Sequence, residues 1–230
     1  MASQMDLPPL SEAMRARRSR MLDQIRLVTS DTRIVNVMAR VRRDLFVPDA
    51  IREAAYEDRA LPIGFDQTIS QPQIVASMTA AVIPGPDDTV LDVGTGSGYQ
   101  AAVLAHLVRR VISVERIPEL AYQARERLRR LGYSNVTVKV AGSKLGAPEN
   151  APFDGIIVAA GAPRIPRTLA GQLREGGRLV IPVGRLDAQY LTRVTRRAAD
   201  RFQIEQLELC QFVPLIGEEA WSEESRQTES

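Results

Sequence analysis

Residues 91–100 read LDVGTGSGYQ and carry three glycines, Gly94, Gly96 and Gly98, between a short apolar run and a helix-like segment. Glycines at this density indicate a backbone that bends sharply or that another group approaches closely. The dinucleotide fingerprint G-x-G-x-x-G places its third glycine one position later, where this chain has Tyr99. No Lys-Ser or Lys-Thr pair follows the loop, which excludes a phosphate-cradling P-loop. For the loop alone, a tight turn without any ligand is the alternative interpretation.

The segments around this loop alternate between strand-like and helix-like patterns. Short apolar runs predict strands at 89–93, 111–115, 136–140, 153–160 and 178–183, and two more strand-like segments lie near 189–196 and 202–213. Helices are expected between them at about 99–109, from Pro118 to Leu131, and from Pro166 to just before Gly176. This alternation predicts an α/β fold with a doubly wound, mostly parallel, seven-stranded Rossmann-like sheet and helices on both faces. Right-handed crossovers place the glycine loop at the carboxyl edge of the sheet, where such folds bind ligands.

The residues before this alternation are predicted to be mostly helical. Apolar residues recur at helical spacing between 11 and 45 as one or two helices, with Asp31 or Thr32 as a cap for the second. Residues 56–72 are rich in turn formers and give no clear secondary structure, and a further helix begins near Pro72. We therefore divide the chain into an N-terminal helical segment (1–80) and an α/β core (81–221), which together form one compact domain, and a disordered polar tail (222–230).

The composition excludes several classes of protein. The hydrophobic fraction of 44% and the charged fraction of 25% are ordinary for a globular domain. No apolar run is long enough to span a membrane, and the N-terminus has no signal-peptide pattern. The single cysteine, Cys210, rules out an internal disulfide and fits a reducing compartment, so we expect a cytoplasmic protein.

The histidine and the charged residues narrow the possible partners. His106 is the only histidine, so neither a His/Cys zinc site nor a Ser-His-Asp triad is favoured, and we interpret this residue as a solvated or capping side chain of a helix. A net charge of +2 carries no general signature of polyanion binding. Four arginines within RARRSR (15–20) are interpreted as a solvated helix face, with contact to nucleic acid as the alternative.

Two acidic residues give the glycine loop a chemical context. Glu115 ends the next strand, 21 residues after Gly94. An acidic side chain at this place accepts hydrogen bonds from ribose hydroxyls and repels a 2′-phosphate, which disfavours NADP; the alternative is a surface carboxylate at a strand end. Asp92 precedes the glycines and could orient loop amides, approach a cationic ligand centre, or play a buried structural role. The residues thus indicate a ligand that contains a nucleoside.

The loop spacing and the acidic strand end resemble the class I S-adenosylmethionine-dependent methyltransferases. The ligand of that class lacks a pyrophosphate, so its amino-acid part and ribose are what approach the glycines. Its sulfonium is positive, which tolerates nearby carboxylates. The glycine spacing makes an NAD-dependent oxidoreductase the less favoured interpretation.

Longer motifs resemble the protein-L-isoaspartate O-methyltransferase family, in order from about residue 20 to 221. The most specific are LPIGFDQTISQPQIVASM (61–78) and VLDVGTGSGYQAAVLAHL (90–107), and RDLFVPD (43–49), APFDGIIVAAGAPRIP (151–166) and FVPLIG (212–217) also fit. The resemblance implies methyl transfer from S-adenosylmethionine to the free α-carboxylate of an L-isoaspartyl residue in a damaged protein. The ester then closes to a succinimide, which hydrolyses partly to aspartate. Because a carboxylate is already nucleophilic and a sulfonium is a good leaving group, alignment and desolvation should dominate catalysis.

The resemblance also implies roles for individual residues. Ser70 is expected between cofactor and substrate, where its hydroxyl and nearby amides bind the substrate carboxylate; alternatively, Thr68 and Ser70 merely cap the helix that begins near Pro72. Residues 56–72 then contain the substrate loop. No metal is expected. The expected cofactor-binding residues are Gln67, Thr68, Asp92, Gly94, Thr95, Gly96, Ser97, Gly98, Glu115, Arg116, Gly142 and Ser143.

Two positions depart from the family pattern. Where the family usually has Gly-Asp-Gly, whose aspartate meets the adenine amino group, this chain has Ala141-Gly142-Ser143, so weaker cofactor binding is expected. Asp66 stands where the family often has glycine, and its charge would disfavour an anionic substrate unless it points away.

Two alternative functions stay open at this point. One is a cofactor-binding relative that has lost catalysis and acts as a sensor or scaffold. The other is a methyltransferase for a different peptide or an RNA, with the arginines at 15–20 as the hint. The favoured partners are proteins and peptides that contain isoaspartyl residues, without a membrane or nucleic-acid partner, and we expect a monomer.

Overall fold

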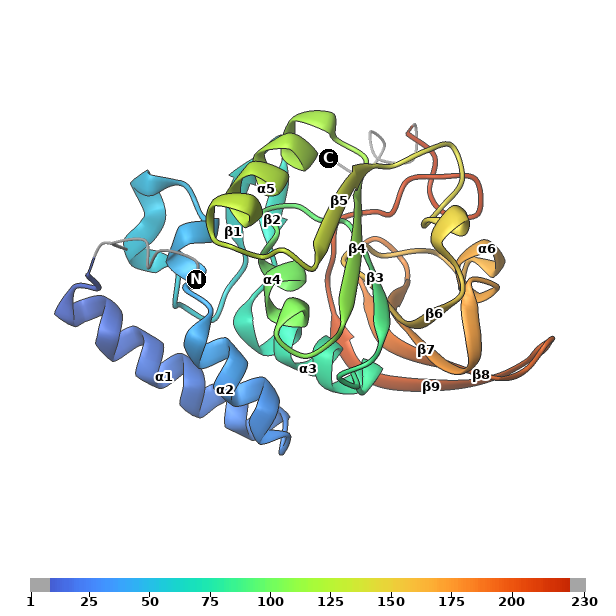
Figure 1. The fold of residues 1–230 in the computed structure, drawn as a ribbon, viewed down its shortest axis with the longest axis horizontal. Coiled ribbons are helices and arrows are strands. Elements are labelled where there is room, and N and C mark those ends of the chain that lie inside the picture. The colour runs from blue at the N-terminus through green and yellow to red at the C-terminus, as the bar shows by residue number, and fades with distance from the viewer. Residues whose placement is uncertain (1–8, 224–230) are drawn as a thin grey trace.

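A computed structural model of the protein describes residues 9–223. A single seven-stranded sheet runs through it in the order β5-β4-β3-β6-β7-β8-β9 (Figure 1). The pairs from β5 to β7 are parallel, and β8 and β9 are antiparallel. The predicted fold class is therefore confirmed. The strands of this sheet are β3 (Thr89–Val93), β4 (Arg110–Glu115), β5 (Val136–Val140), β6 (Phe153–Val158), β7 (Leu173–Gly184), β8 (Gln189–Ala198) and β9 (Arg201–Cys210).

Alternate residues of the central strands point to opposite faces of the sheet and build two apolar clusters. On β3, Val90 belongs to the cluster on one face and Leu91 to the cluster on the other. The first cluster includes residues of α1 to α5, and the second includes Leu169 and Ala170 of α6. Burying both faces is what a parallel sheet requires. The helices beside the strands are α3 (Pro72–Val82), α4 (Tyr99–Ala105), α5 (Pro118–Arg130) and α6 (Arg167–Ala170), and a short 3-10 turn is η3 (Pro148–Asn150).

The order of the strands creates a crevice beside β3. The chain runs from β3 to β4 and β5 on one side, and then returns to β6 on the other side of β3. The loops after β3 and β6 therefore leave the sheet in opposite directions at its carboxyl edge. Open α/β sheets bind ligands at such a switch point.

Two predicted helices end earlier than expected. The helix predicted from Pro166 to Gly176 is only the four-residue α6, and the chain joins the sheet at Leu173, which pairs with Phe153 and is fully buried. Gly176, with φ 78°, lies where the pairing of β6 and β7 shifts its register, so this glycine allows a strand irregularity and does not end a helix. Helix α4 stops at Ala105 instead of about 109, and β6 and β9 also end earlier than predicted.

Residues 9–69, the described N-terminal part, contain two α-helices, two 3-10 helices and a hairpin. The helices are α1 (Glu12–Val28), α2 (Thr32–Arg40), η1 (Arg43–Phe46) and η2 (Asp49–Ala54). Asp31 caps α2 by accepting a hydrogen bond from the amide of Arg33 at 2.9 Å, as one of the two predicted caps. The ambiguous region 56–72 holds the hairpin β1 (Leu61–Gly64) and β2 (Gln67–Ile69).

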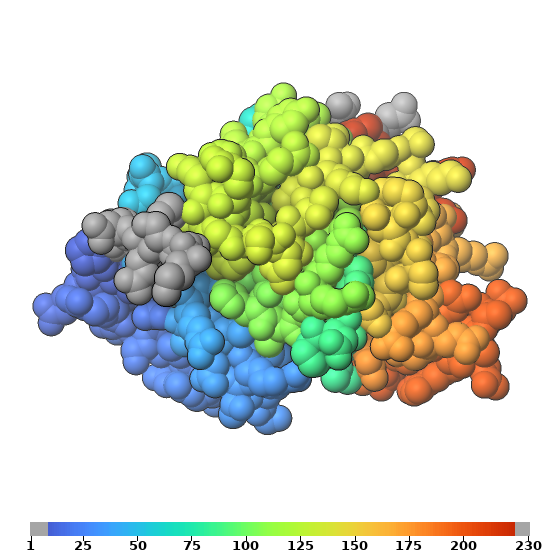
Figure 2. All heavy atoms as spheres, viewed as in Figure 1, coloured from blue at the N-terminus to red at the C-terminus, as the bar shows by residue number. Residues whose placement is uncertain are grey.

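The N-terminal helices pack directly on the α/β core. Helix α1 contacts α3 and α2 contacts α4, and the blue N-terminal residues lie flush against the green ones in the space-filling view (Figure 2). Within the RARRSR stretch, Arg17 turns toward η2, where its Nη1 donates to the Glu53 carbonyl at 2.5 Å. Arg15 and Arg20 are exposed, as expected for a solvated face.

Two further observations concern the ends of the chain and the lengths of the helices. Of the tail predicted to be disordered, only Ser222 and Glu223 are among the described residues. Between residues 9 and 223, no helix combines the length and apolar character needed to cross a membrane.

Candidate active site

The glycine loop after β3 is fixed to the neighbouring strand β4. The Val114 carbonyl accepts hydrogen bonds from the amides of Gly94 at 2.9 Å and Thr95 at 3.2 Å, and the Gly98 amide donates to the Thr95 carbonyl at 2.8 Å. These bonds turn the chain tightly between β3 and α4. All three glycines have positive φ, at 92°, 51° and 89° in chain order.

Two of these glycines also have little room for a side chain. A Cβ on Gly96 would lie 3.2 Å from Cδ1 of Ile63 in β1, and a Cβ on Gly98 would lie 3.1 Å from Cδ1 of Leu128 in α5. Positive φ and close packing together explain why glycine stands at both positions. The loop thus touches the β1–β2 hairpin on one side and α5 on the other.

Glu115 holds the loop from the end of β4. Its side chain is 7% exposed; Oε2 accepts a hydrogen bond from the Gly96 amide at 2.8 Å, and Oε1 accepts one from the Ile117 amide at 3.0 Å. Each carboxylate oxygen can accept a second hydrogen bond. Glu115 also borders the cavity described below, so it can bind hydroxyl groups there while it fixes the loop.

Asp92 lies behind the loop and not in the cavity. It is fully buried; Ser113 Oγ donates to its Oδ2 at 2.7 Å, and the hydroxyls of Ser113 and Thr95 are 2.5 Å apart. Its Oδ1 has no hydrogen-bond partner in the described part of the chain. Burial, opposed by the Ser113 hydrogen bond and reinforced by the charge of Glu115, raises the pKa of Asp92 to about 7. This position agrees with the structural alternative for Asp92.

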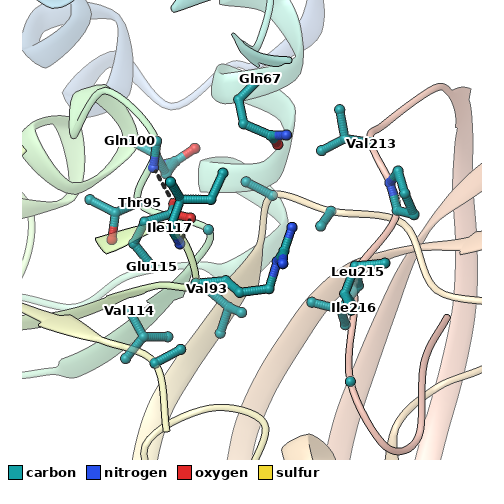
Figure 3. Close-up of a pocket in the computed structure, with 18 of the residues that line it drawn as sticks. Gln67, Val93, Thr95, Gln100, Val114, Glu115, Ile117, Val213, Leu215 and Ile216 are labelled. Atoms are coloured by element: carbon teal, nitrogen blue, oxygen red, sulfur yellow. Dashed lines mark hydrogen bonds between the residues drawn. The ribbon is translucent and has the colours of Figure 1, made fainter. Parts of the chain in front are cut away.

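A cavity of about 240 Å³ opens at the carboxyl edge of the sheet, at the switch point beside β3. In Figure 3, Thr95, Glu115 and Ile117 lie on one side of it, Val213, Leu215 and Ile216 lie across from them, and Gln67 points toward it from the hairpin. Neither Asp92 nor Gly98 is among the described residues that border it. The predicted site residues that do border it are Gln67, Thr68, Ser70, Gly94, Thr95, Gly96, Ser97, Glu115, Arg116, Gly142 and Ser143.

The segment that carries Ser70 reaches the cavity from the hairpin. Phe65 and Asp66 form its turn, each with φ 54°, and the Gln67 side-chain amide donates to their carbonyls at 3.1 Å and 3.0 Å. The Gln67 side chain therefore holds both turn residues in the left-handed region. Asp66 is exposed and borders the cavity, so its charge lies at the edge of the site.

Ser70 itself is not a helix cap. The N-cap of α3 is Gln71, whose side chain makes no capping hydrogen bond, and the Gln73 amide in the first turn donates to Asp58 Oδ1 at 3.1 Å. The alternative that Thr68 and Ser70 serve only as caps is therefore wrong. Ser70 borders the cavity, and its hydroxyl makes no hydrogen bond to any residue between 9 and 223.

The loop after β5 also borders the cavity, and most of its residues are exposed. The Ala141 amide donates to the Glu115 carbonyl at 2.8 Å, and Gly142, Ser143 and Lys144 beyond it are exposed. A Cβ on Gly142 would meet nothing within 4 Å. Lys144 also borders the cavity, and no sequence motif predicted it as a site residue.

The C-terminal segment Val213–Gly217 is the main part of the site that the sequence did not predict. The Gly161 amide donates to the Val213 carbonyl at 2.8 Å, and the Leu215 amide donates to the Gly161 carbonyl at 2.7 Å. These bonds bring the segment beside the loop that follows β6. The FVPLIG motif was the available signal, but nothing in its residue types indicates a cavity wall. Tyr99, Gln100 and Leu145 also border the cavity and were not predicted to do so.

The fold and the site together define a class I S-adenosylmethionine-dependent methyltransferase. A parallel sheet with antiparallel β8 and β9 at its edge carries the glycine loop after β3 and the acidic end of β4 beside one cavity. The residues fit this cofactor, because Glu115 retains acceptor capacity for ribose hydroxyls while Val93, Val114 and Ile117 supply apolar surface for a base.

Comparisons with known proteins identify the family. Residues 16–220 match the family described as protein-L-isoaspartate(D-aspartate) O-methyltransferase. Protein-L-isoaspartate O-methyltransferase 2 of Marinobacter nauticus is 54% identical, over 84% of this chain and 88% of the relative. The protein-L-isoaspartate O-methyltransferase of Syntrophotalea carbinolica is 50% identical, over 87% of this chain and 92% of the relative. The chain belongs to the protein-L-isoaspartate O-methyltransferase family.

Solved structures agree with this assignment. A protein-L-isoaspartate O-methyltransferase structure superimposes with a TM-score of 0.77 at 26% identity, over 88% of this chain and 67% of that one. A putative member from Plasmodium falciparum, solved in complex with S-adenosyl-L-homocysteine, gives a TM-score of 0.73 at 25% identity, over 85% of this chain and 96% of that one. The protein is thus a methyltransferase that uses S-adenosylmethionine as its methyl donor.

Proposed function

We propose that this protein methylates the α-carboxylate of L-isoaspartyl residues in proteins and peptides, and that Ser70 aligns that carboxylate. One observation carries the proposal: Ser70 and Glu115 border the same cavity, so the segment expected to bind substrate meets the loop expected to bind cofactor. Ser70 follows the β1–β2 hairpin, and Glu115 ends β4.

The roles of the residues follow from the hydrogen bonds that they leave open. The Ser70 hydroxyl donates to one oxygen of the substrate carboxylate and leaves the other free to attack. Glu115 accepts hydrogen bonds from the ribose, and Gly142 and Ser143 lie at the base end of the cavity with main-chain groups and a hydroxyl. When bound, S-adenosylmethionine supplies a methyl group on a positively charged sulfur. No residue has to remove a proton, because the substrate carboxylate is ionised at neutral pH.

The remaining predicted residues support these groups. Gln67 and Thr68 shape the mouth beside Ser70, and Arg116 follows Glu115 at the cavity edge, where it pairs with Glu223 at 2.6 Å. Ser97 and Thr95 line the floor of the glycine loop. Asp92 acts indirectly, since the Ser113 hydroxyl links it to Thr95.

The domain organisation, the oligomeric state and the location of the protein are part of the same proposal. The two segments, 1–80 and 81–221, act as one compact domain, which is supported by the apolar cluster that continues from α1 into the sheet. We also propose that the protein is a monomer, and a location in the cytoplasm fits a chain with one cysteine. A nucleic-acid partner is not favoured, because Arg17 of the basic stretch is paired with Glu53 within the chain.

A peptide assay tests the proposed reaction. The protein is incubated with labelled S-adenosylmethionine and two peptides that differ only in an aspartyl or an isoaspartyl linkage. We expect base-labile methyl incorporation into the isoaspartyl peptide alone. Cofactor binding without transfer to either peptide would overturn the proposal and favour a sensor, a scaffold or another methyl acceptor.

The Ser70→Ala variant tests the role of the serine. Losing one hydrogen bond to a charged group should lower kcat by about 10- to 100-fold, with the Kd for S-adenosylmethionine changed by less than about 2-fold. Ser77→Ala is the matched control, because Ser77 is also half-buried on this segment of the chain but does not border the cavity. Equal losses of turnover and cofactor affinity in Ser70→Ala would assign Ser70 a structural role instead.

A further inference from the structure

Arg43 is a charged side chain that lies entirely inside the protein. It contacts both the segment that carries Ser70 and the helix that follows the glycine loop. It is 0% exposed; its Nε donates to the Ala55 carbonyl at 2.7 Å, and its Nη2 donates to the Ser70 carbonyl at 2.7 Å. Its guanidinium carbon lies 4.8 Å from the centre of the Tyr99 ring. One side chain therefore contacts Ala55 at the end of η2, the main chain at Ser70, and Tyr99 at the start of α4.

The charge of Arg43 is compensated in an unusual way. No carboxylate between residues 9 and 223 forms an ion pair with it, and the adjacent Asp44 pairs with Arg42 at 2.7 Å. Burial lowers the pKa of Arg43, but a guanidinium is so basic that it stays charged at neutral pH. Two carbonyl oxygens and one aromatic face are therefore its direct contacts, and the charge of Asp58 stabilises the cation from a longer distance. Nη1 has no hydrogen-bond partner in the described chain.

This arrangement makes the position of Ser70 sensitive to Arg43. If the Ser70 carbonyl moved away, a buried charged donor would lose one of its two hydrogen bonds. The cation therefore restrains the main chain at Ser70 more strongly than a neutral donor would. The hydroxyl of Ser70 is fixed only by the backbone that carries it.

The other contact of Arg43 leads to the cofactor side. Tyr99 is the first residue of α4, directly after the glycine loop, and it borders the cavity. Phe46 packs edge-on against the same ring at 5.5 Å between centroids, so the ring is held from two sides. Arg43 consequently links the segment at Ser70 to the end of the glycine loop through one rigid planar group.

We propose that Arg43 is a positioning residue, which sets the distance between Ser70 and the glycine loop and so aligns the substrate carboxylate with the methyl donor. The inference rests on the proposed function of Ser70. An arginine suits this task because its planar fork reaches two carbonyls and stacks on a ring at the same time, which a lysine ammonium does not. A residue that served only to fill the core would not need the charge.

Two variants test this inference. Arg43→Met keeps most of the volume and removes the buried charge, so the fold should survive, but the Ala55 and Ser70 carbonyls lose their donor and the Tm should fall by a few degrees. We expect kcat for an isoaspartyl peptide to fall by about 10-fold or more, with the Kd for S-adenosylmethionine changed by less than about 2-fold. Arg43→Lys should recover part of kcat, because the ammonium can still reach one of the two carbonyls.

Arg42→Lys is the matched control. It makes the same exchange one residue away, at a side chain that pairs with Asp44 and does not bond to Ser70. We expect its kcat to be unchanged even if its Tm falls. Hydrogen exchange of the backbone amides within 67–72, all but that of Pro72, is the second readout, and this segment should exchange faster in Arg43→Met than in Arg42→Lys.

The outcomes separate this inference from the proposed function. An Arg43→Met protein with unchanged kcat and unchanged exchange at 67–72 would overturn the positioning role and leave the proposed function intact. If the unchanged protein fails to methylate any isoaspartyl peptide, the proposed function fails. In that case the exchange measurement still decides whether Arg43 restrains the segment. Equal exchange at 67–72 in Arg43→Met and Arg42→Lys would reject that restraint.

Discussion

The glycine loop (94–98) and the loop after β5 (141–144) face the same cavity from strands on either side of β4, but they are held in different ways. The glycine loop makes main-chain hydrogen bonds to β4, and its Gly96 amide donates to the Glu115 carboxylate. It also packs against Ile63 and Leu128. In the loop after β5, the Ala141 amide bonds to β4, and the three residues beyond it are exposed.

The difference teaches where this site can tolerate change. At the glycine loop, the backbone conformation, the packing and a buried carboxylate all depend on one another, so a single substitution disturbs several interactions. At the loop after β5, a side chain can be added without contacting anything within 4 Å of Gly142. We therefore expect substitutions to act on folding stability in the first loop and on ligand affinity in the second.

The largest effect is expected for Gly98→Ala. An alanine there adopts φ 89°, which costs about 1–2 kcal/mol, and its Cβ lies 3.1 Å from the buried Leu128, which adds about 1 kcal/mol or more. The free energy of unfolding, measured by denaturant titration, should fall by about 3 kcal/mol.

Gly132→Ala isolates the conformational part of that loss. Gly132 has a similar φ of 81°, but a Cβ there would meet nothing within 4 Å. Its substitution should cost only about 1–2 kcal/mol. If both variants lose the same free energy of unfolding, packing against α5 is not what distinguishes the glycine loop.

The second effect concerns Asp92 beneath the same loop and depends on pH. The pKa of this carboxyl is raised from 3.8 to about 7, so the folded protein holds the proton more tightly than the unfolded chain. Stability from this group is thus fully present below about pH 4 and is lost as the pH rises toward 7. Asp92→Asn cannot titrate, so relative to the unchanged protein it should gain about 2 kcal/mol between pH 5 and pH 8.

Parallel stability curves for the two proteins over this pH range would contradict the assignment. Any fixed penalty of Asp92→Asn, such as an amide group without a partner, shifts its curve by a constant amount. The slope of the difference with pH therefore reports the Asp92 carboxyl alone. Denaturant unfolding at four or five pH values is sufficient to measure it.

The sequence predicted the α/β sheet well because its signals are local. Each apolar run forms a strand by its own periodicity, and the glycine loop sits between two such elements. The exceptions arise where long-range pairing decides the structure. Leu173 joins the sheet because Phe153 lies opposite it, and the hairpin turn at Phe65 and Asp66 has no glycine at either position, so its conformation depends on the Gln67 side chain.

The site residues show the same difference between local signals and long-range contacts. The glycine loop and Glu115 were found from spacing, and Ser70 from a longer resemblance. The wall at Val213–Gly217 was missed because its place depends on hydrogen bonds to Gly161, far away in sequence. Arg43 was missed because an arginine is most often a surface residue, and nothing near it in sequence shows that Ala55 and Ser70 surround it.

The third effect is expected for Gly142→Asp in the open loop. The new carboxylate restores the acidic residue of the family pattern at a position with room for it and without positive φ. A charge-assisted hydrogen bond to the adenine amino group should lower the Kd for S-adenosylmethionine by about 10-fold, measured by titration calorimetry. Gly142→Asn is the matched control and should gain less, since it lacks the charge. An unchanged Kd in Gly142→Asp would show that the base is held in another way.

The smallest effect is expected for Gly142→Ala, which tests the openness of this loop directly. Alanine adds a Cβ that meets nothing within 4 Å, and it removes some freedom from the unfolded chain. The free energy of unfolding should stay within about 0.5 kcal/mol of the original value or rise slightly, and the Kd for S-adenosylmethionine should not change. A loss of 1 kcal/mol or more would mean that the loop packs more closely in solution than its exposed residues indicate. The same loss would also remove the contrast with Gly98, because both loops would then depend on glycine.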